Sequence, residues 1–203
     1  MKMESTFAVQ PMSNGNGHTA ERRGIPSPVL AIMILLFTEV MFFGGLISAY
    51  IINRADAIDW PPPGQPRLPV ERTLLNTAFL LISGISAYWS WRFFKRNHRS
   101  YLYALVLTLV LGACFVALQG VEWIRLIQYG LTTSSSLYGA FFYTIVGAHG
   151  VHVLFGLLFL LYVWWKIEQS PTSDKKGLLF AGVLFWYFVV GIWPILYYLV
   201  YLY

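Results

Sequence analysis

Residues 29–52 read VLAIMILLFTEVMFFGGLISAYII, an apolar run whose one carboxylic acid, Glu39, lies near its middle. About 20 apolar residues in a helix cross the roughly 30 Å hydrocarbon core of a bilayer, so this stretch predicts a membrane-spanning helix. Pro28 precedes the run and Arg54 follows it, before three consecutive prolines at 61–63 that cannot be helical.

Four more apolar runs follow, so the chain is predicted to be an all-α membrane protein with five spans in an antiparallel bundle. Composition agrees: 57% of the 203 residues are hydrophobic, 11% are charged, and mean hydropathy is +0.59, leaving too little polar surface for a soluble globule. The further runs lie at about 74–94, 101–124, 137–165 and 178–202.

Residues 1–27 are polar, rich in Ser, Asn and Gly, and hold no apolar core. They are therefore not a secretory signal peptide, and we expect a disordered cytoplasmic tail followed by a membrane domain at 28–203. The single cysteine, Cys114, lies inside an apolar run, so this chain cannot build a disulfide framework or a thiolate metal cluster on its own.

Lys and Arg are distributed unequally between the two ends of the predicted bundle. By the positive-inside rule this places the N-terminus inside and the C-terminus outside. Such residues favour anionic lipid headgroups as partners rather than nucleic acid. The inner face carries Lys2, Arg22, Arg23, Arg92, Lys95, Arg96, Arg99, Lys166, Lys175 and Lys176, and the outer face carries Arg54, Arg67, Arg72 and Arg125.

Glu39 is costly to bury, because an ionisable group near the centre of a span carries a penalty of at least about 2.5–3.5 kcal/mol. Gly44, Gly45 and Ser48 follow it at a spacing that lets another helix approach closely. We expect a neutral carboxyl that donates a hydrogen bond across the bundle. An interhelical tether is favoured over a proton relay, because a relay needs a chain of partners and only one acid lies this deep.

His149 and His152 lie three residues apart in the fourth run, on one helical face with the small residues Gly147 and Gly150 between and beside them. Two histidines on one face cannot ligate opposite sides of a haem, and no Glu-x-x-His pair of the di-iron type accompanies them. We expect no metal ligation, but hydrogen bonds from these imidazoles to Glu39, Glu122 or a lipid headgroup.

Two runs carry small and polar residues at helical spacing, which predicts inward faces suited to close packing with side-chain hydrogen bonds. Glu122 ends one of these faces beside Arg125, so it is interpreted as an interfacial acid near a basic partner. The third run contributes Thr108, Gly112, Phe115, Gln119 and Glu122, and the second contributes Asn76, Phe79, Ser83, Ser86 and Ser90.

The sequence holds no phosphate-binding loop, nucleophile elbow, Cys-x-x-Cys or zinc pattern. Residue chemistry alone therefore leaves two possibilities, a subunit of a larger complex or a small proton-coupled transporter with Glu39 as its coupling site. The sequence shows no internal repeat of the kind many transporters have, which counts against the second.

Several short motifs, taken in order, resemble subunit III of cytochrome c oxidase. TEVMFF at 38–43 resembles the family's run around a buried acid, and LLNT at 74–77 resembles its Leu-Leu-Asn-Thr helix start. LQGVEW at 118–123 is similar to Leu-Gln-x-x-Glu-Tyr/Trp. Tyr138-Gly139 with Phe141-Phe142 is similar to Tyr-Gly-x-x-Phe-Phe, and GAHGVHV at 147–153 is similar to Thr-Gly-x-His-Gly-x-His-Val. The resemblance runs from about Ile32 to the C-terminus and fits the short, five-helix kind.

One family motif differs in this chain. The last family helix usually reads Trp-His-Phe-Val-Asp-x-x-Trp, whereas residues 186–193 read WYFVVGIW, with Tyr187 and Val190 in place of the His and the Asp. This departure puts in doubt any polar network that those two residues would complete.

The resemblance implies a subunit without haem or copper in a bacterial plasma membrane, which docks on the haem-copper subunit I together with subunit II and a small subunit IV. It implies phospholipid binding and support of proton uptake and stability during oxygen reduction. Glu39 falls on the family's carbodiimide-reactive carboxyl, and His149, His152 and Glu122 fall on other recurring positions. A cofactor-free accessory subunit of a nitric oxide reductase is the alternative within a related branch.

Overall fold

The computed structural model describes residues 27–66, 68–169 and 175–203, and these residues form long helices and no strand. The all-α prediction is therefore confirmed. The predicted tail lies outside the described residues except for Ser27, where the first helix begins. The elements are α1 (Ser27–Ala55), α2 (Val70–Lys95), α3 (Tyr101–Gln128), α4 (Leu137–Gln169), α5 (Lys175–Tyr197) and the π-helical segment η1 (Tyr198–Leu202).

Four helices, α1, α3, α4 and α5 continued by η1, are long and apolar enough to cross a membrane. The remaining helix, α2, is 26 residues long, which is also sufficient for a crossing. Its hydropathy is lower because a buried polar face runs along it, including Asn76, Ser83 and Ser90. This face packs against α3 and α5, so the polar groups of α2 turn away from the surroundings of the bundle.

Two helix ends are closed by left-handed residues that stop the helix and satisfy its last carbonyls. Asn97 has φ 54° after α2, and its amide bonds to the carbonyl of Phe94 at 3.0 Å. Gly130 has φ 88° after α3, and its amide bonds to the carbonyl of Ile127 at 3.0 Å. In both cases the amide of the following residue bonds to the carbonyl five residues earlier, His98 to Phe93 and Leu131 to Leu126. This pattern is a Schellman motif, which ends each helix.

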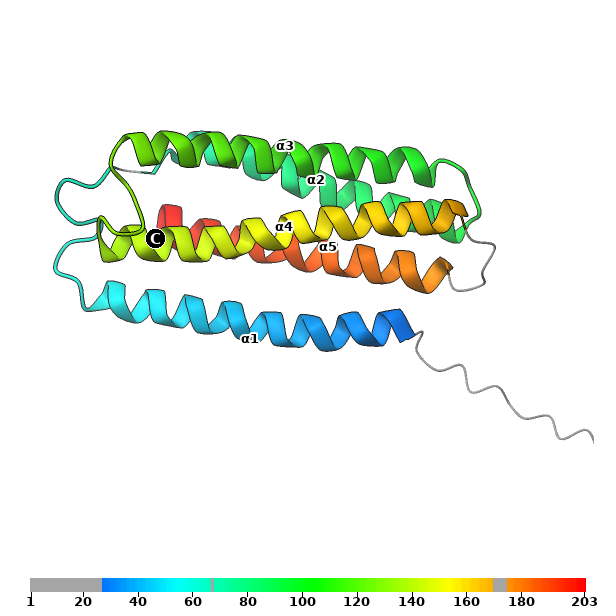
Figure 1. Ribbon diagram of the computed structural model, residues 1–203, viewed down its shortest axis with the longest axis horizontal. Coiled ribbons are helices and arrows are strands. Elements are labelled where there is room, and N and C mark those ends of the chain that lie inside the picture. Colours follow the sequence, from blue (N-terminus) through cyan, green and yellow to red (C-terminus); the bar gives the residue numbers. More distant parts are fainter. Residues whose placement is uncertain (1–26, 67, 170–174) are drawn as a thin grey trace, which may run out of the picture.

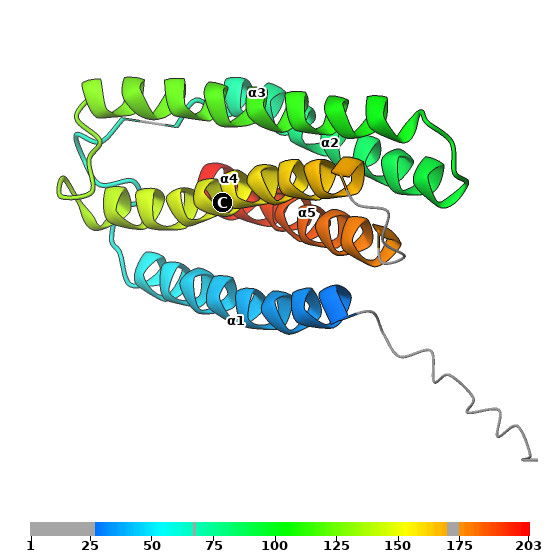
Figure 2. The ribbon, with the colours of Figure 1, turned by 45° about the vertical axis from the view of Figure 1, so that its right-hand side comes forward.

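The bundle consists of two helical hairpins and one outlying helix (Figure 1). Helices α2 and α3 form one hairpin, α4 and α5 form the other, and α5 lies centrally against α2 and α1. Figure 2 shows α1 along the outer side of the α4–α5 hairpin, away from α2 and α3. The centre is filled by large aromatic side chains, of which Trp186 and Trp193 of α5 are fully buried.

Pro194 lies inside α5. Proline has no amide hydrogen, so the carbonyl of Val190 loses its helical partner. The helix continues and changes to π-helical pitch from Tyr198 onward. This change turns Val200 and Tyr201 into the bundle.

Candidate functional site

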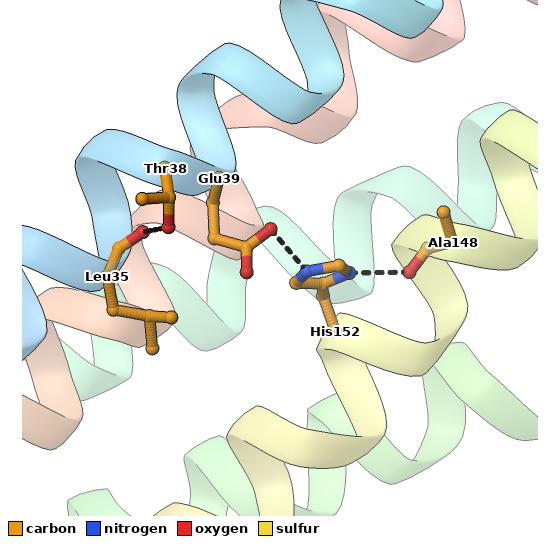
Figure 3. A network of polar contacts seen from close by, with 5 residues as sticks. All are labelled: Leu35, Thr38, Glu39, Ala148 and His152. Carbon is orange, nitrogen blue, oxygen red and sulfur yellow. Dashed lines mark hydrogen bonds and ion pairs between the residues drawn. The ribbon is translucent and has the colours of Figure 1, made fainter.

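Glu39 of α1 and His152 of α4 form an ion pair or hydrogen bond near the middle of the bundle (Figure 3). Oε2 of Glu39 lies 2.8 Å from Nε2 of His152, and the two side chains are only 19% and 17% exposed. On the other side of the ring, Nδ1 of His152 lies 2.7 Å from the carbonyl oxygen of Ala148. The imidazole is therefore held between its own helix and α1.

These contacts fix how many protons the pair contains. A carbonyl oxygen only accepts, so Nδ1 of His152 must donate to Ala148. The contact between Nε2 and Glu39 then needs one more proton, on the carboxyl or on the ring. In either arrangement the pair has no net charge, so burying it costs less than burying one of its charges without a partner.

Aromatic rings surround the pair on the side of α1. The His152 ring stacks on Phe42 with centroids 6.2 Å apart and meets Phe43 edge-on at 5.1 Å. Phe43 is fully buried and also contacts Phe188 of α5, at 6.1 Å. This cluster therefore links α1 to α4, in addition to the packing of α1 along α5.

His149 has a different environment, although it lies one turn from His152. It is 1% exposed, stacks on Trp193 with centroids 4.8 Å apart, and meets Phe115 edge-on at 6.0 Å. Neither ring nitrogen has a hydrogen-bond partner among the described residues. The predicted bond to Glu39 or Glu122 is therefore not formed, because the ring points between α3 and α5 and Glu39 is taken by His152.

Glu122 joins a buried hydrogen-bonded cluster toward the end of the bundle that the Lys and Arg distribution predicts to be the outer one. Its Oε2 accepts from the hydroxyl of Thr73 at 3.0 Å and from the side-chain amide of Gln119 at 3.4 Å. Gln119 also donates to the hydroxyl of Tyr201 at 3.2 Å and accepts from Asn76 at 3.1 Å. Glu122 is only 6% exposed and its carboxyl turns inward, as the predicted inward face requires, and it lines a small pocket together with its predicted basic partner Arg125.

Neither Thr73 nor Tyr201 was placed in this cluster from the sequence. Thr73 precedes Asn76 by three residues, so extending the polar stripe of α2 backward by one turn would have included it. Tyr201 carries no comparable signal. It reaches the cluster because η1 rotates the C-terminal residues inward, and a change of helical pitch cannot be read from hydropathy.

The predicted packing glycines fall into two groups. A Cβ on Gly112 would lie 2.7 Å from the Trp186 ring and 2.8 Å from Leu157, so α3 needs glycine there. Gly44 and Gly45 have nothing within 4 Å of a Cβ, and Ser48 bonds only to the carbonyl of Gly44 within its own helix. The predicted close approach at these α1 residues is therefore not formed among the residues that the structure describes.

The remaining predicted packing residues have close neighbours. The ring of Trp123 lies 3.4 Å from a Cβ built on Gly150 and 3.9 Å from one built on Gly147. Ser83 accepts a hydrogen bond from the indole of Trp186 at 3.1 Å. These contacts place Trp123 of α3 over the glycines of α4 and hold Trp186 of α5 against α2.

The two residues that depart from the usual family motif lie on α5. Val190 is 7% exposed, and one of its methyl groups lies 3.0 Å from a Cβ built on Gly84 of α2. Tyr187 is 37% exposed and lies at the surface of the bundle. The apolar Val190 thus packs closely where a carboxylate would need polar partners.

A cavity of about 330 Å³ lies at the predicted outer end of the bundle. Its aromatic walls include Tyr50, Trp60 and Tyr138, and the Trp60 indole donates to the hydroxyl of Tyr50 at 3.2 Å. The guanidinium of Arg54 lies 4.0 Å from the ring centre of Tyr203. Within the described ranges, no group of three or more His, Cys, Asp or Glu side chains is arranged to hold a metal.

Taken together, the helices define an integral membrane protein, a five-helix bundle with a buried Glu–His pair and a second, hydrogen-bonded acid. The profile of the family described as cytochrome c oxidase subunit III matches residues 6–203. The chain belongs to this family.

Curated relatives agree with this assignment. The chain is 34% identical over 180 residues to "Cytochrome c oxidase subunit 3" of Pyricularia grisea, covering 85% of this chain and 66% of that protein. It is 33% identical over 195 residues to the protein of the same name from Emericella nidulans, covering 92% and 70%. A Synechocystis protein of that name is 32% identical over 203 residues, covering 98% and 83%.

Proposed function

We propose that this chain is the non-catalytic subunit III of a haem-copper terminal oxidase, in which partner subunits hold haem and copper and reduce oxygen. The family match over residues 6–203 carries this proposal, and it makes the chain a subunit of an oxidase complex. The partners would be the catalytic subunit I, and with it subunit II and a small subunit IV.

The Glu39–His152 pair supports a more specific role. It joins the outlying helix α1 to α4 at 2.8 Å, in surroundings where few other polar groups are available. We assign it as an interhelical tether that keeps α1 in place while subunit I turns over. Through this fixed surface the chain would sustain proton uptake and the durability of the complex, without passing protons itself.

We propose that the chain lies in a bacterial plasma membrane, and the exposed apolar surface of α1 supports its contact with lipid. Phe37 and Met41 are 70% and 66% exposed, so α1 presents a broad apolar surface. At the predicted inner end, Arg92, Arg96 and Arg99 are exposed beside the α2–α3 turn, where they suit phospholipid phosphates. The inside position of the N-terminus follows from the Lys and Arg distribution.

The proposal is tested by purifying the complex through a tag on this chain in gentle detergent. We expect a haem-bearing large chain in the mass spectrum and oxygen consumption by the preparation. Consumption of nitric oxide but not of oxygen would assign the chain to the reductase branch. Transport by the chain alone in vesicles would show that it is a transporter.

The supporting role needs a second comparison, between complexes with and without this chain at equal haem content. We expect the complex that lacks the chain to take up protons more slowly and to lose oxygen consumption sooner during turnover. Glu39→Gln in the complete complex should keep both properties, because the amide can still bond to His152 without transferring a proton. A pumping defect in that variant would instead make Glu39 a relay.

A further inference from the structure

A shallow groove of about 430 Å³ runs along the α2–α3 hairpin, beside the turn that joins the two helices. Its sides are large apolar residues, and the residues that line it all belong to this hairpin and its turn. Most of these side chains are exposed, so the groove is open to the surroundings of the bundle. The exposed ones are Ile82, Ile85 and Trp89 of α2, and Tyr103 and Leu107 of α3.

Small residues form the floor of the groove. The hydroxyl of Ser86 donates there to the carbonyl of Ala104 at 2.7 Å. Ser86 is only 6% exposed, whereas Trp89 beside it is 47% exposed, so the sides stand above the floor. Because its hydroxyl hydrogen is already bonded, Ser86 needs no polar partner from an occupant. The floor therefore suits an apolar chain better than water.

The length of the groove matches one leaflet of a bilayer. Its lining residues on α2 run from Ile82, at the middle of that helix, to Phe93, near the turn. At about 1.5 Å per residue this is about 16 Å, and half of the roughly 30 Å hydrocarbon core is about 15 Å. A spanning helix of a partner would cross both leaflets, whereas the groove stops at the middle of α2. An acyl chain of one leaflet has the extent that the groove requires.

Basic residues lie where the groove reaches the turn. Arg92 and Arg96 lie on the same face of α2 as the lining residues, and both are exposed. The sequence from 92 to 103 holds four Lys or Arg residues and no acid. Glu168, an acid at the same end, bonds to Tyr101, which does not line the groove. The charge at this end therefore complements an anionic headgroup.

We propose that this groove binds one anionic phospholipid, with an acyl chain along its floor and the headgroup phosphate at Arg92 and Arg96. The lipid comes from the inner leaflet, since the Lys and Arg distribution places this end inside. Trp89 and Phe93, with ring centroids 5.6 Å apart, flank the chain near the interface, where aromatic residues are favoured. This inference rests on the membrane location proposed above, and it adds the class of lipid and the place where it binds.

The first test is a structure of the complete complex in nanodiscs that contain phosphatidylglycerol and phosphatidylcholine. We expect elongated density along the groove that ends in a headgroup beside Arg92 and Arg96. A helix of a partner subunit in the groove, or an empty groove where other lipids are ordered, would overturn the proposal.

Lipid counts by native mass spectrometry give an independent answer. The complex, freed of its own lipid in detergent, is mixed with phosphatidylglycerol and phosphatidylcholine that carry identical acyl chains. Ala104→Phe should fill the floor and remove one bound phosphatidylglycerol per complex. Ala78→Phe, at an exposed residue of α2 outside the groove, should keep it. An unchanged count in Ala104→Phe contradicts the site.

A charge variant isolates the headgroup contact and leaves the floor of the groove intact. Arg92→Gln with Arg96→Gln should lower the preference for phosphatidylglycerol about thirtyfold, which corresponds to about 1 kcal/mol for each arginine. Lys166→Gln with Lys176→Gln, exposed at the same end, should leave the preference unchanged. An equal loss in both double variants, or in neither, refutes the headgroup site. Haem content and oxygen consumption of the same preparation test the subunit assignment separately, because lipid counting needs no turnover.

Discussion

Replacing Gly112 with alanine should destabilise the bundle, although alanine is the better helix former. The new methyl carbon would lie 2.7 Å from the Trp186 ring and 2.8 Å from Leu157. Leu157 can change rotamer, but Trp186 cannot move easily. It is fully buried, its indole is bonded to Ser83 at 3.1 Å, and its ring lies 3.0 Å from a Cβ built on Gly156.

The size of the effect follows from two opposing terms. Overpacking a well-filled core costs about 1–3 kcal/mol, and the fixed position of Trp186 favours the upper end of that range. The helix propensity of alanine returns up to about 1 kcal/mol. We therefore expect Gly112→Ala to lower the free energy of unfolding by roughly 2 kcal/mol.

The assay is detergent-induced unfolding of the purified protein in mixed micelles, with Gly120→Ala as the matched control on the same helix. A Cβ on Gly120 meets nothing within 4 Å, so that variant should be as stable as the parent or slightly more stable. If Gly112→Ala proved at least as stable as Gly120→Ala, the close packing of α3 on Trp186 would be refuted.

Three further predictions concern single contacts. Glu39→Gln should allow assembly of the complex, whereas Glu39→Lys should reduce its yield, because a buried cation facing His152 costs at least about 2.5–3.5 kcal/mol; a normal yield with lysine would contradict the tether. Thr77→Val should lower the free energy of unfolding by about 1–3 kcal/mol, because the indole of Trp193, now 2.8 Å from the Thr77 hydroxyl, would lose its acceptor. An unfolding free energy equal to that of the parent would contradict this. Gly139→Ala should lower the melting temperature, because a Cβ there collides with the backbone carbonyl of Thr132, and an unchanged value would show that this turn relaxes freely.

The number and approximate bounds of the helices could be predicted from hydropathy, because each apolar run is long enough to span a bilayer. The inward faces of α2 and α3 could also be predicted, because small and polar residues recur at helical spacing along each helix. Asn76 and Ser83 of α2 and Gln119 of α3 are all buried. Polar atoms gain nothing from contact with lipid, so a polar stripe on a spanning helix indicates a protein-facing side.

The partners of individual residues could not be predicted. His149 and His152 share a face, but a separation of three residues turns them by about 60° relative to each other, enough to direct one toward α3 and α5 and the other toward α1. Gly44 lies four residues before Ser48, a spacing of small residues that is typical of closely packed helices, yet it faces outward. Lipid and protein interior are equally apolar, so sequence pattern does not distinguish Gly44 from Gly112.

The Glu39–His152 contact joins residues 113 positions apart, which has a consequence for biogenesis. At a synthesis rate of about 5–20 residues per second, α1 is made roughly 6–23 s before its imidazole partner. During that interval the nascent carboxyl has no counterpart from its own chain. We therefore expect α1 to enter the bilayer with Glu39 protonated, and to gain its polar contact across the bundle only when α4 emerges.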